Sequence, residues 1–358
     1  MKYMKAITII PKEKGSAKLM EVPVPSYKKN EVLVRVLDAG ICRTDLEIYE
    51  GLYGETPVGE NYLIMGHESL GVIEKVGRDI TTLRQGNLVA RTVRRQCIDM
   101  CINCRNDEQD MCLTGNYVET GIKGLHGVMA EYYVDSPKNL VRVQKKFADF
   151  GVLMEPLSFS EKAVRQTYLV GERMSAWEPK KALVIGAGPI GLLEAMILRA
   201  KGLDTYVAAW SKEGNNKSGI VSEIGARYVS VQEKPLNTLG KFDIIIESSG
   251  TVEMIGDAMQ QLNTNGVLCL TSITGGERKL CLPLEKINID FVLGNKSIVG
   301  AVNASMKDYS EGKKHLHNFE SLWPGVTKKL ITRRVNPENY LAAFEKKPGD
   351  IKTVIEFT

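Results

Sequence analysis

The chain lacks any long hydrophobic run. Only a short apolar stretch precedes Pro11, too short for the core of a signal peptide, and no later stretch approaches the length that spans a membrane. The 358 residues also lack an excess of one charge, because 47 Lys and Arg are balanced by 43 Asp and Glu without long like-charged runs. These absences predict a cytoplasmic protein that has neither a membrane nor a nucleic acid as partner.

Internal repeats and low-complexity linkers are absent too, so the chain is expected to form ordinary globular domains. The first third alternates short apolar segments with Gly, Asn and Asp, which predicts an irregular, mostly β domain. Later strand-like and helix-like segments alternate in the rhythm of a doubly wound parallel sheet. We therefore predict an α/β protein with a mostly β domain at 1–175, a parallel-sheet domain at 176–307, and a segment at 308–358 that returns to the first domain.

A glycine-rich turn marks the second domain. The pattern GxGxxG lies directly after the strand-like KALVI and directly before an apolar helix. In this setting the glycines permit a tight turn, the approach of a pyrophosphate and close helix–sheet packing, and the helix N-terminus favours phosphate. The motif therefore predicts a dinucleotide site rather than a glycine turn without a ligand. Its residues are Gly186, Gly188, Pro189, Ile190 and Gly191.

The end of the second predicted strand, TYVAAW, governs the choice between NAD and NADP. An acidic residue here holds the ribose hydroxyls of NAD, whereas basic residues accept the 2′-phosphate of NADP. Trp210, Ser211 and Lys212 occupy this position without a carboxylate that repels phosphate, which favours NADP. Use of NAD stays open because Glu213 follows, and because Lys212 equally fits a solvated loop lysine.

Four of the seven cysteines lie close together in the first domain. In a chain without secretory features, such a cluster indicates a metal rather than disulfides. Four thiolates complete the tetrahedral shell of zinc and leave no open position, so we predict a structural zinc site instead of four free thiols. Its ligands are Cys97, Cys101, Cys104 and Cys112.

A second, sparser set combines a thiolate, an imidazole and two carboxylates, the donor types of a catalytic zinc. Its members are Cys42 in GICRTD, His67 and Glu68 in GHESLG, and Glu155 in MEPL. Taken alone, they also fit a buried cysteine and a structural histidine. The dinucleotide motif favours zinc, since hydride transfer needs an ionised alcohol and zinc lowers the pKa of a coordinated hydroxyl. Thr44 is suited to relay the released proton to solvent.

Several motifs resemble those of the zinc-dependent medium-chain dehydrogenase/reductase superfamily, namely GICRTD, GHESLGVIEKVG and GAGPIG. The sequence most resembles archaeal glucose dehydrogenases, through the VRRQC cysteine lobe, ETGIKGLHG, MEPLSFSEK, GAVN and GDIKTVI. The resemblance implies a GroES-like catalytic domain, a Rossmann domain for NADP or NAD, one catalytic and one structural zinc, and a homotetramer. The implied reaction passes hydride from the anomeric carbon of glucose, or a related sugar, to nicotinamide and gives a lactone.

The resemblance also implies roles for single residues. It places Cys42, His67, Glu68 and Glu155 around the catalytic zinc. The positions that match sugar contacts are Thr44, Glu119, Glu155 and Asn303. The positions that match further cofactor contacts are Thr271, Ser272, Ile273, Ala301, Val302, Asn303 and Lys352. The cysteine lobe begins CxxxC where the family has CxxC, and we expect the structural zinc to tolerate the extra residue.

Other functions stay open at this point. A simple alcohol or polyol dehydrogenase would have an apolar pocket, whereas Glu119 and Asn303 suggest a polar one. A zinc-stabilised nucleic-acid-binding module would need a clustered basic face, and RTVRRQ is the only compact basic cluster before the cysteines. A catalytically inactive ligand sensor also fits the same motifs.

Overall fold

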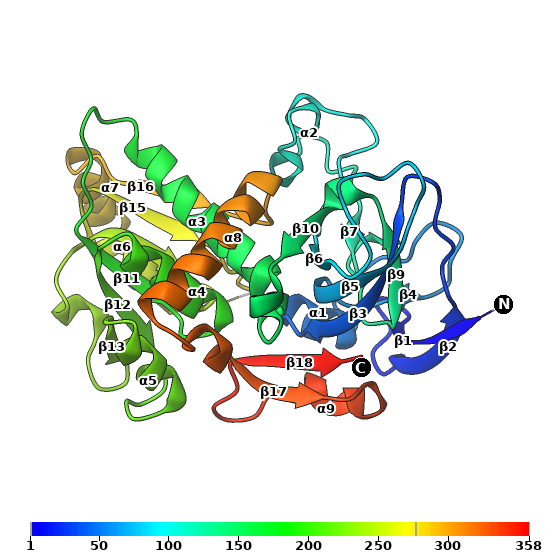
Figure 1. The fold of residues 1–358 in the computed structure, drawn as a ribbon. Helices are drawn as coiled ribbons and strands as arrows, with labels where there is room; N and C mark the ends of the chain where they lie inside the picture. Colours follow the sequence, from blue (N-terminus) through cyan, green and yellow to red (C-terminus); the bar gives the residue numbers. More distant parts are fainter. Residues whose placement is uncertain (1, 276–277, 358) are drawn as a thin grey trace. The chain divides into compact units, whose positions relative to one another are not determined.

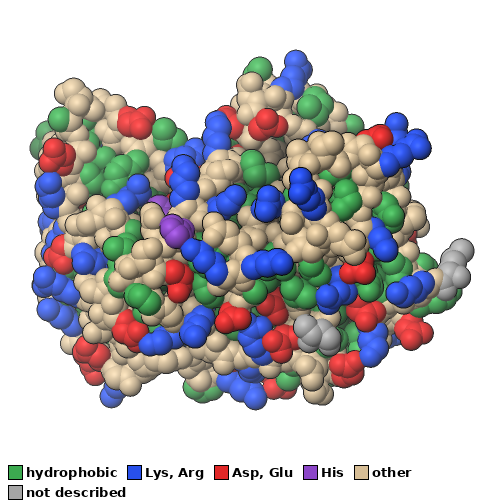
Figure 2. Space-filling model, viewed as in Figure 1, with side chains coloured by type: hydrophobic (Ala, Val, Ile, Leu, Met, Phe, Trp, Pro, Cys, Tyr) green, Lys and Arg blue, Asp and Glu red, His purple; other side chains and the backbone are tan. Residues whose placement is uncertain are grey.

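The computed structural model describes residues 2–275 and 278–357. The chain divides into two compact units, one formed by Met1–Glu155, Asn303–Lys313 and Ile331–Thr358, the other by Pro156–Val302 and Lys314–Leu330. Each unit has a hydrophobic core of its own. Across the described part, no helix combines the length and the apolar character that crossing a membrane requires. Acidic and basic side chains are both spread over the face shown in Figure 2.

The first unit is built on two sheets, labelled in Figure 1. The larger has the strand order β10-β6-β5-β3-β18-β17, with β9 paired to β3, and the smaller has the order β2-β1-β4. Buried and half-buried residues alternate along most of β3, because successive side chains of a strand point to opposite faces. The strands of these sheets are β1 (Tyr3–Ile9), β2 (Lys18–Pro23), β3 (Val32–Gly40), β4 (Leu63–Ile64), β5 (Glu68–Val76), β6 (Leu88–Arg91), β9 (Tyr132–Asp135), β10 (Leu140–Val143), β17 (Ile331–Val335) and β18 (Lys352–Glu356).

Short elements complete the first unit. A two-stranded pair, β7 (Glu119–Thr120) and β8 (Gly124–Leu125), lies outside the two main sheets. Strand β18 pairs antiparallel with β3 and parallel with β17, which carries the end of the chain back into the larger sheet. The helices are α1 (Arg43–Tyr49), α2 (Ile102–Arg105), α9 (Tyr340–Phe344) and the 3-10 turns η1 (Gln109–Met111), η2 (Pro137–Asn139), η3 (Lys145–Phe147), η4 (Gly151–Leu153) and η7 (Pro337–Asn339).

The second unit holds a parallel sheet of six strands in the order β13-β12-β11-β14-β15-β16. The strand order reverses between β11 and β14, the place where doubly wound folds bind their ligands. Together with the mostly β first unit, this sheet confirms the predicted fold class. The elements are β11 (Lys181–Ile185), β12 (Asp204–Ala209), β13 (Arg227–Ser230), β14 (Phe242–Glu247), β15 (Leu262–Leu270), β16 (Ser297–Gly300), α3 (Met154–Gly171), α4 (Pro189–Ala200), α5 (Asn216–Glu223), α6 (Val252–Gln260), α7 (Leu284–Leu293), α8 (Met306–Leu322), η5 (Leu236–Thr238) and η6 (Thr327–Leu330).

The boundaries of the units differ from the predicted domains 1–175, 176–307 and 308–358. Helix α3 belongs to the second unit from Pro156 on, because its Ser160 hydroxyl and Lys162 ammonium bond backbone carbonyls of that unit. Helix α8 passes from the first unit into the second, where His315 Nδ1 lies 2.5 Å from Glu161 Oε1 on α3. Two of the unit boundaries therefore fall inside helices, one within α3 and one within α8.

Candidate active site

Three predicted metal ligands meet in the first unit. One ligand atom each from Cys42, His67 and Glu68 lies within 4.8 Å of the others. Cys42 directly precedes α1, and His67 and Glu68 lie at the start of β5, so strand and helix ends hold the set. His67 and Glu68 are buried, and Cys42 is half-buried. A thiolate, an imidazole and a carboxylate at this spacing fit a zinc ion with an open position.

Glycines make the space in which this set forms. Gly66 has φ +89°, in the left-handed region that favours glycine, and so turns the chain into His67. A Cβ on Gly40 of β3 would lie 2.1 Å from Glu68 Oε2. A Cβ on Gly121 would lie 2.0 Å from the Gly66 carbonyl oxygen, so the loops that carry His67 and Glu119 touch through their backbones.

Asp45 lies behind His67 and was not singled out from the sequence. Its Oδ2 accepts the Cys42 backbone N–H over 2.8 Å, and its Oδ1 lies 3.3 Å from His67 Nδ1 without the alignment of a hydrogen bond. Burial alone would lower the pKa of His67, but Asp45 and Cys42 outweigh it and raise that pKa well above its usual value. A carboxylate behind a ligating histidine fixes the ring orientation.

Lys352 on β18 forms a buried ion pair with Glu68. Its Nζ donates to Oε1 and Oε2 of Glu68 over 2.7 Å each, and to the Ile41 carbonyl over 3.0 Å. The two residues are 2% and 1% exposed, so each charge depends on the other for compensation. Lys352 thus contacts a candidate zinc ligand, and its predicted contact with the cofactor remains a prediction.

Glu155, the fourth predicted ligand, is buried beside this set but does not join the group of mutually close atoms. Burial raises the pKa of Glu155 to about 7, while His67 and Lys352 oppose the shift and Glu68 adds to it. Glu155 therefore lies next to the candidate metal ligands with a pKa that burial raises above its usual value.

Two predicted sugar-binding residues are bonded to each other. Asn303 Nδ2 donates to Glu119 Oε1 over 2.9 Å, and Arg94 Nε donates to the same oxygen over 3.0 Å. Neither bond involves Oε2 of Glu119, so this oxygen is suited to accept a hydrogen bond from a substrate hydroxyl. Arg94, which the sequence analysis did not identify, also stacks over the Tyr117 ring at 3.9 Å. Thr44, the fourth sugar position, lies half-buried in the first turn of α1.

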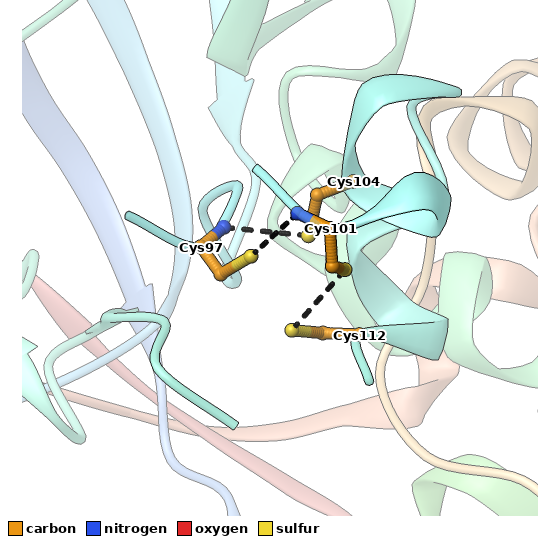
Figure 3. A group of neighbouring side chains, drawn as sticks. All are labelled: Cys97, Cys101, Cys104 and Cys112. Atoms are coloured by element: carbon orange, nitrogen blue, oxygen red, sulfur yellow. Dashed lines mark hydrogen bonds between the residues drawn. The ribbon is translucent and has the colours of Figure 1, made fainter. Parts of the chain in front are cut away.

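The four lobe cysteines gather around one point in Figure 3. One sulfur from each of Cys97, Cys101, Cys104 and Cys112 lies within 4.8 Å of the others, so the CxxxC spacing does not separate them. The Cys101 and Cys112 sulfurs are 3.9 Å apart. This separation matches the roughly 3.8 Å between thiolates that share a tetrahedral zinc with Zn–S bonds of about 2.3 Å. The donor set therefore fits a zinc ion without an open position.

The thiols of the lobe differ in acidity. Backbone hydrogen bonds from Leu113 and Cys104 lower the pKa of Cys101 to about 6, whereas burial raises the pKa of Cys104 to about 12.

The lobe is also linked to Glu119. Arg94 Nη1 donates to the Asp110 carbonyl of the lobe over 3.2 Å, while Arg94 Nε donates to Glu119 Oε1. Arg94 therefore connects the cysteine lobe to the predicted sugar-binding pair.

The glycine-rich turn of the second unit lies between β11 and α4. Gly186 has φ +118°, and a Cβ on Gly191 would lie 1.9 Å from the Gly186 carbonyl oxygen, so both positions need glycine. A Cβ on Gly188, the residue that caps α4, meets nothing within 4 Å. Open space at the N-terminus of α4, where Pro189 and Ile190 begin the helix, fits the phosphates of a dinucleotide.

The predicted cofactor-selecting loop follows β12. Trp210 is 65% exposed, and Ser211 and Lys212 are exposed as well. The hydroxyls of Ser211 and Tyr228 are 2.6 Å apart, and the Tyr228 hydroxyl donates to the Ser211 carbonyl over 2.8 Å. Tyr228 on β13, another residue without a signal in the sequence, therefore holds Ser211 in place.

Other predicted cofactor contacts follow the ends of β15 and β16. Thr271 Oγ1 donates to the Glu247 carbonyl over 2.8 Å, and the Ala301 backbone N–H donates to the Leu270 carbonyl over 3.0 Å. Ends of neighbouring parallel strands meet at one edge of a sheet, which is the ligand-binding edge of doubly wound folds. The residues found at this edge are Thr271, Ser272, Ile273, Ala301 and Val302, whereas Asn303 and Lys352 belong to the first unit.

The first unit is mostly β and holds a thiolate–imidazole–carboxylate set and a four-cysteine lobe. The second unit has a doubly wound sheet of the dinucleotide-binding type. Together these features define a class of proteins, the zinc-type medium-chain dehydrogenases. Comparison with known families agrees with this assignment. The alcohol dehydrogenase GroES-like domain matches residues 28–145, and the glucose dehydrogenase C-terminus matches residues 148–357.

Individual relatives cover nearly the whole chain. Glucose 1-dehydrogenase of Methanocella arvoryzae is 40% identical over 357 residues, and glucose 1-dehydrogenase 2 of Vulcanisaeta moutnovskia is 39% identical over 355, with 99% of each chain covered. Glucose dehydrogenase of Haloferax mediterranei, solved in complex with NADP, Zn and gluconolactone, is 31% identical, covers 99% of both chains and superposes with a TM-score of 0.90. The chain therefore belongs to the glucose dehydrogenase family, as its motifs predicted.

We expect Cys104→Ser to release about one zinc ion per chain, because one missing thiolate opens the tetrahedral shell. The melting temperature should fall far more than the rate of hydride transfer changes. Metal analysis, thermal unfolding and single-turnover kinetics measure these effects, with Cys281→Ser, at an exposed cysteine outside the lobe, as the matched control. Intact protein whose lobe cysteines are freely alkylated without loss of zinc would contradict the structural-site hypothesis.

Proposed function

We propose that the protein is a zinc-dependent dehydrogenase that oxidises the anomeric carbon of D-glucose, or of a related aldose, with NADP or NAD. The observation that carries the proposal is the backbone contact between Gly66 and Gly121, which brings the loop of the polar Glu119 beside the loop of the candidate ligand His67. A polar pair next to a metal site suits a polyhydroxylated substrate better than a simple alcohol. The full-length relatives named as glucose dehydrogenases support the same choice.

The chemistry assigns a task to each group of residues. The C1–H bond breaks, its electron pair passes as hydride to nicotinamide, the hydroxyl proton leaves to solvent, and C1 becomes the carbonyl carbon of a lactone. Glu119 and Asn303 bind sugar hydroxyls, and the Thr44 hydroxyl passes the proton outward. A zinc ion held by the predicted ligands would supply a Lewis acid that makes the hydroxyl easier to ionise. These ligands are Cys42, His67, Glu68 and Glu155.

The proposal includes two zinc ions per chain, the second in the four-cysteine lobe, and NADP as the favoured cofactor. Ser211 and Lys212 offer a hydroxyl and a cation, and no carboxylate occupies the end of β12 where it would repel a phosphate. The described cysteines are all free of disulfides, which suits a reducing compartment such as the cytoplasm.

We further propose a homotetramer, with a second copy of the chain on the β16 edge of the parallel sheet. In the described part, β16 pairs with β15 alone, so its other edge is free to pair. Exposed apolar side chains lie on β16 and on α7, the helix that precedes it in the chain, and patches of such side chains mark contact surfaces. They are Ile298 on β16 and Leu284, Ile289, Val292 and Leu293 on α7.

The oligomeric state is tested by light scattering, which should give the mass of four chains for the wild-type protein. The Ile298→Glu variant should give smaller species. A wild-type monomer would contradict the proposal.

A panel of substrates tests the function. With purified enzyme and either cofactor, glucose or a related aldose should react far faster than sorbitol, which has no anomeric carbon, or ethanol, which has no further hydroxyl for the Glu119–Asn303 pair.

His67→Ala should reduce turnover by orders of magnitude yet keep cofactor binding, since the glycine turn belongs to the other unit. His317→Ala, at an exposed histidine of α8, is the control. Near wild-type activity in zinc-depleted His67→Ala would refute the zinc mechanism.

Cofactor choice is tested at the loop after β12. Loss of a charge-assisted hydrogen bond to phosphate costs about 1.5–3 kcal/mol, roughly ten- to a hundredfold in affinity. Lys212→Ala should therefore raise the KM for NADP and spare NAD, and Ser211→Asp should favour NAD further because a carboxylate repels the 2′-phosphate. Lys234→Ala, at another exposed lysine of this unit, is the control. An unchanged ratio of NADP to NAD use would show that selection lies elsewhere.

A further inference from the structure

Glu194 is an acidic residue in the middle of an apolar helix. Helix α4 reads PIGLLEAMILRA, and Glu194 is 0% exposed, like its neighbours Leu193 and Ala195. Within residues 2–275 and 278–357, no cation pairs with it, and its Oε1 has no hydrogen-bond partner. An isolated carboxylate in such a place would carry a large desolvation cost, which a neutral carboxylic acid avoids.

A chain of hydroxyl groups begins at its other oxygen. Glu194 Oε2 is hydrogen-bonded to Ser248 Oγ, Ser248 Oγ lies 2.9 Å from Thr271 Oγ1, and Thr271 Oγ1 donates to the Glu247 carbonyl over 2.8 Å. Each hydroxyl carries one proton to donate. Because Thr271 gives its proton to the carbonyl, Ser248 must give its own to Thr271, and the bond to Glu194 then needs a proton from the carboxyl group. All three bonds therefore form at once only when Glu194 is protonated.

The chain of hydroxyls ends where the dinucleotide is expected. Ser248 follows β14, and its backbone N–H donates to the Ile185 carbonyl over 2.8 Å. A Cβ on Gly186 would lie 3.0 Å from the Ser248 carbonyl carbon, so Ser248 packs against the glycine-rich turn. Thr271 follows β15, at a position predicted to lie near the nicotinamide. Glu194 thus reaches two strand ends at the ligand-binding edge of the sheet.

We propose that Glu194 is a positioning residue that acts as a neutral hydrogen-bond donor, holding Ser248 and Thr271 at the dinucleotide site, and that loss of its proton weakens cofactor binding. The proposal rests on the proposed function of the second unit as the cofactor-binding unit. Deprotonation would leave Ser248 with one proton for two acceptors, and would add a negative charge behind the site of an anionic cofactor.

The surroundings of Glu194 favour the neutral form. Burial raises the pKa of Glu194 to about 8, and the Glu247 carboxylate on β14 adds to the shift, whereas the hydrogen bonds that the Ser248 and Thr271 hydroxyls would donate to an ionised Glu194 oppose it. The other ionisable groups nearby are Cys269 on β15, which interacts electrostatically with Glu194, and Lys162 on α3, which interacts with Cys269. Burial raises the pKa of the Cys269 thiol as well, so it adds no negative charge at neutral pH.

The binding test compares Glu194→Gln with Glu194→Leu, because the amide keeps a donor for Ser248 and the apolar side chain removes it. NADPH fluorescence titration of the wild-type protein should show binding that weakens as pH rises through about 8, the pKa of Glu194. Glu194→Gln should bind equally well throughout, whereas Glu194→Leu should bind about three- to tenfold more weakly at every pH, the factor for one ordinary hydrogen bond. Glu172→Gln, at an exposed acid of the same unit, is the control.

Stability supplies an independent measurement. A carboxyl whose pKa is raised on folding destabilises the folded state progressively between its unfolded pKa of 4.5 and its folded value of about 8. The melting temperature of Glu194→Gln should therefore rise relative to wild type across this interval and stay level above it. Infrared spectra at neutral pH should show the carbonyl stretch of a protonated carboxylic acid that Glu194→Gln removes.

The outcomes separate the possible failures. A wild-type pH dependence of binding in Glu194→Gln, or binding by this variant as weak as in Glu194→Leu, would overturn the positioning role. Absence of the infrared band that the variant removes would overturn the neutral state. A wild-type protein that binds no dinucleotide at any pH would instead refute the proposed function, and the infrared and melting experiments would still test the proton on Glu194.

Discussion

The backbones of two loops of the first unit meet at Gly66 and Gly121, with no room for a side chain on Gly121, whose Cβ would lie 2.0 Å from the Gly66 carbonyl oxygen. His67 directly follows one of these glycines, and Glu119 precedes the other by two residues. A side-chain contact can adjust by changing rotamer, but a contact between backbones cannot. The candidate zinc ligand and the candidate sugar-binding carboxylate are therefore positioned relative to each other by the path of the chain, which is the precision that an orienting active site requires.

Glu119 is also connected to the cysteine lobe, through Arg94. Arg94 donates one hydrogen bond to the Asp110 carbonyl of the lobe and another to Glu119 Oε1, and Asn303 donates to the same oxygen. Arg94 and Glu119 are both less than one-tenth exposed, so this ion pair is weakly screened by solvent. A zinc ion that ordered the proposed four-thiolate site would therefore also order Glu119, the candidate sugar-binding carboxylate. The proposed structural zinc site and the proposed sugar contact are thus linked by hydrogen bonds through Arg94.

Sequence alone could predict the fold class and the four-cysteine lobe because both leave local patterns, a glycine turn between strand and helix and a cluster of thiols. Asp45 also had a local signal that was overlooked, since it stands three residues after Cys42 and accepts the backbone N–H there as a helix-capping residue does. The family resemblance marked Lys352 as a cofactor contact, but no local pattern predicted its ion pair with Glu68. The two residues are 284 positions apart, and the pairing of β18 with β3 brings them together. The two units differ in their bounds from the predicted domains, since α3 and α8 each have residues in both units.

Two buried acids, Glu68 and Glu194, avoid the desolvation cost of an isolated buried charge in two different ways. Glu68 stays beside the ammonium group of Lys352, which compensates a negative charge that a zinc site can use. Glu194 has no cation beside it in the described part of the chain and is bonded to the Ser248 hydroxyl instead, an arrangement that suits a neutral acid. The difference follows from the ligands. A metal ion is attracted by anionic donors, whereas a dinucleotide brings its own negative phosphates, so a second uncompensated charge behind the glycine turn would oppose binding. An acid can therefore be kept at the dinucleotide site only with its proton, and the apolar faces of α4 that exclude water are what keep the proton on it.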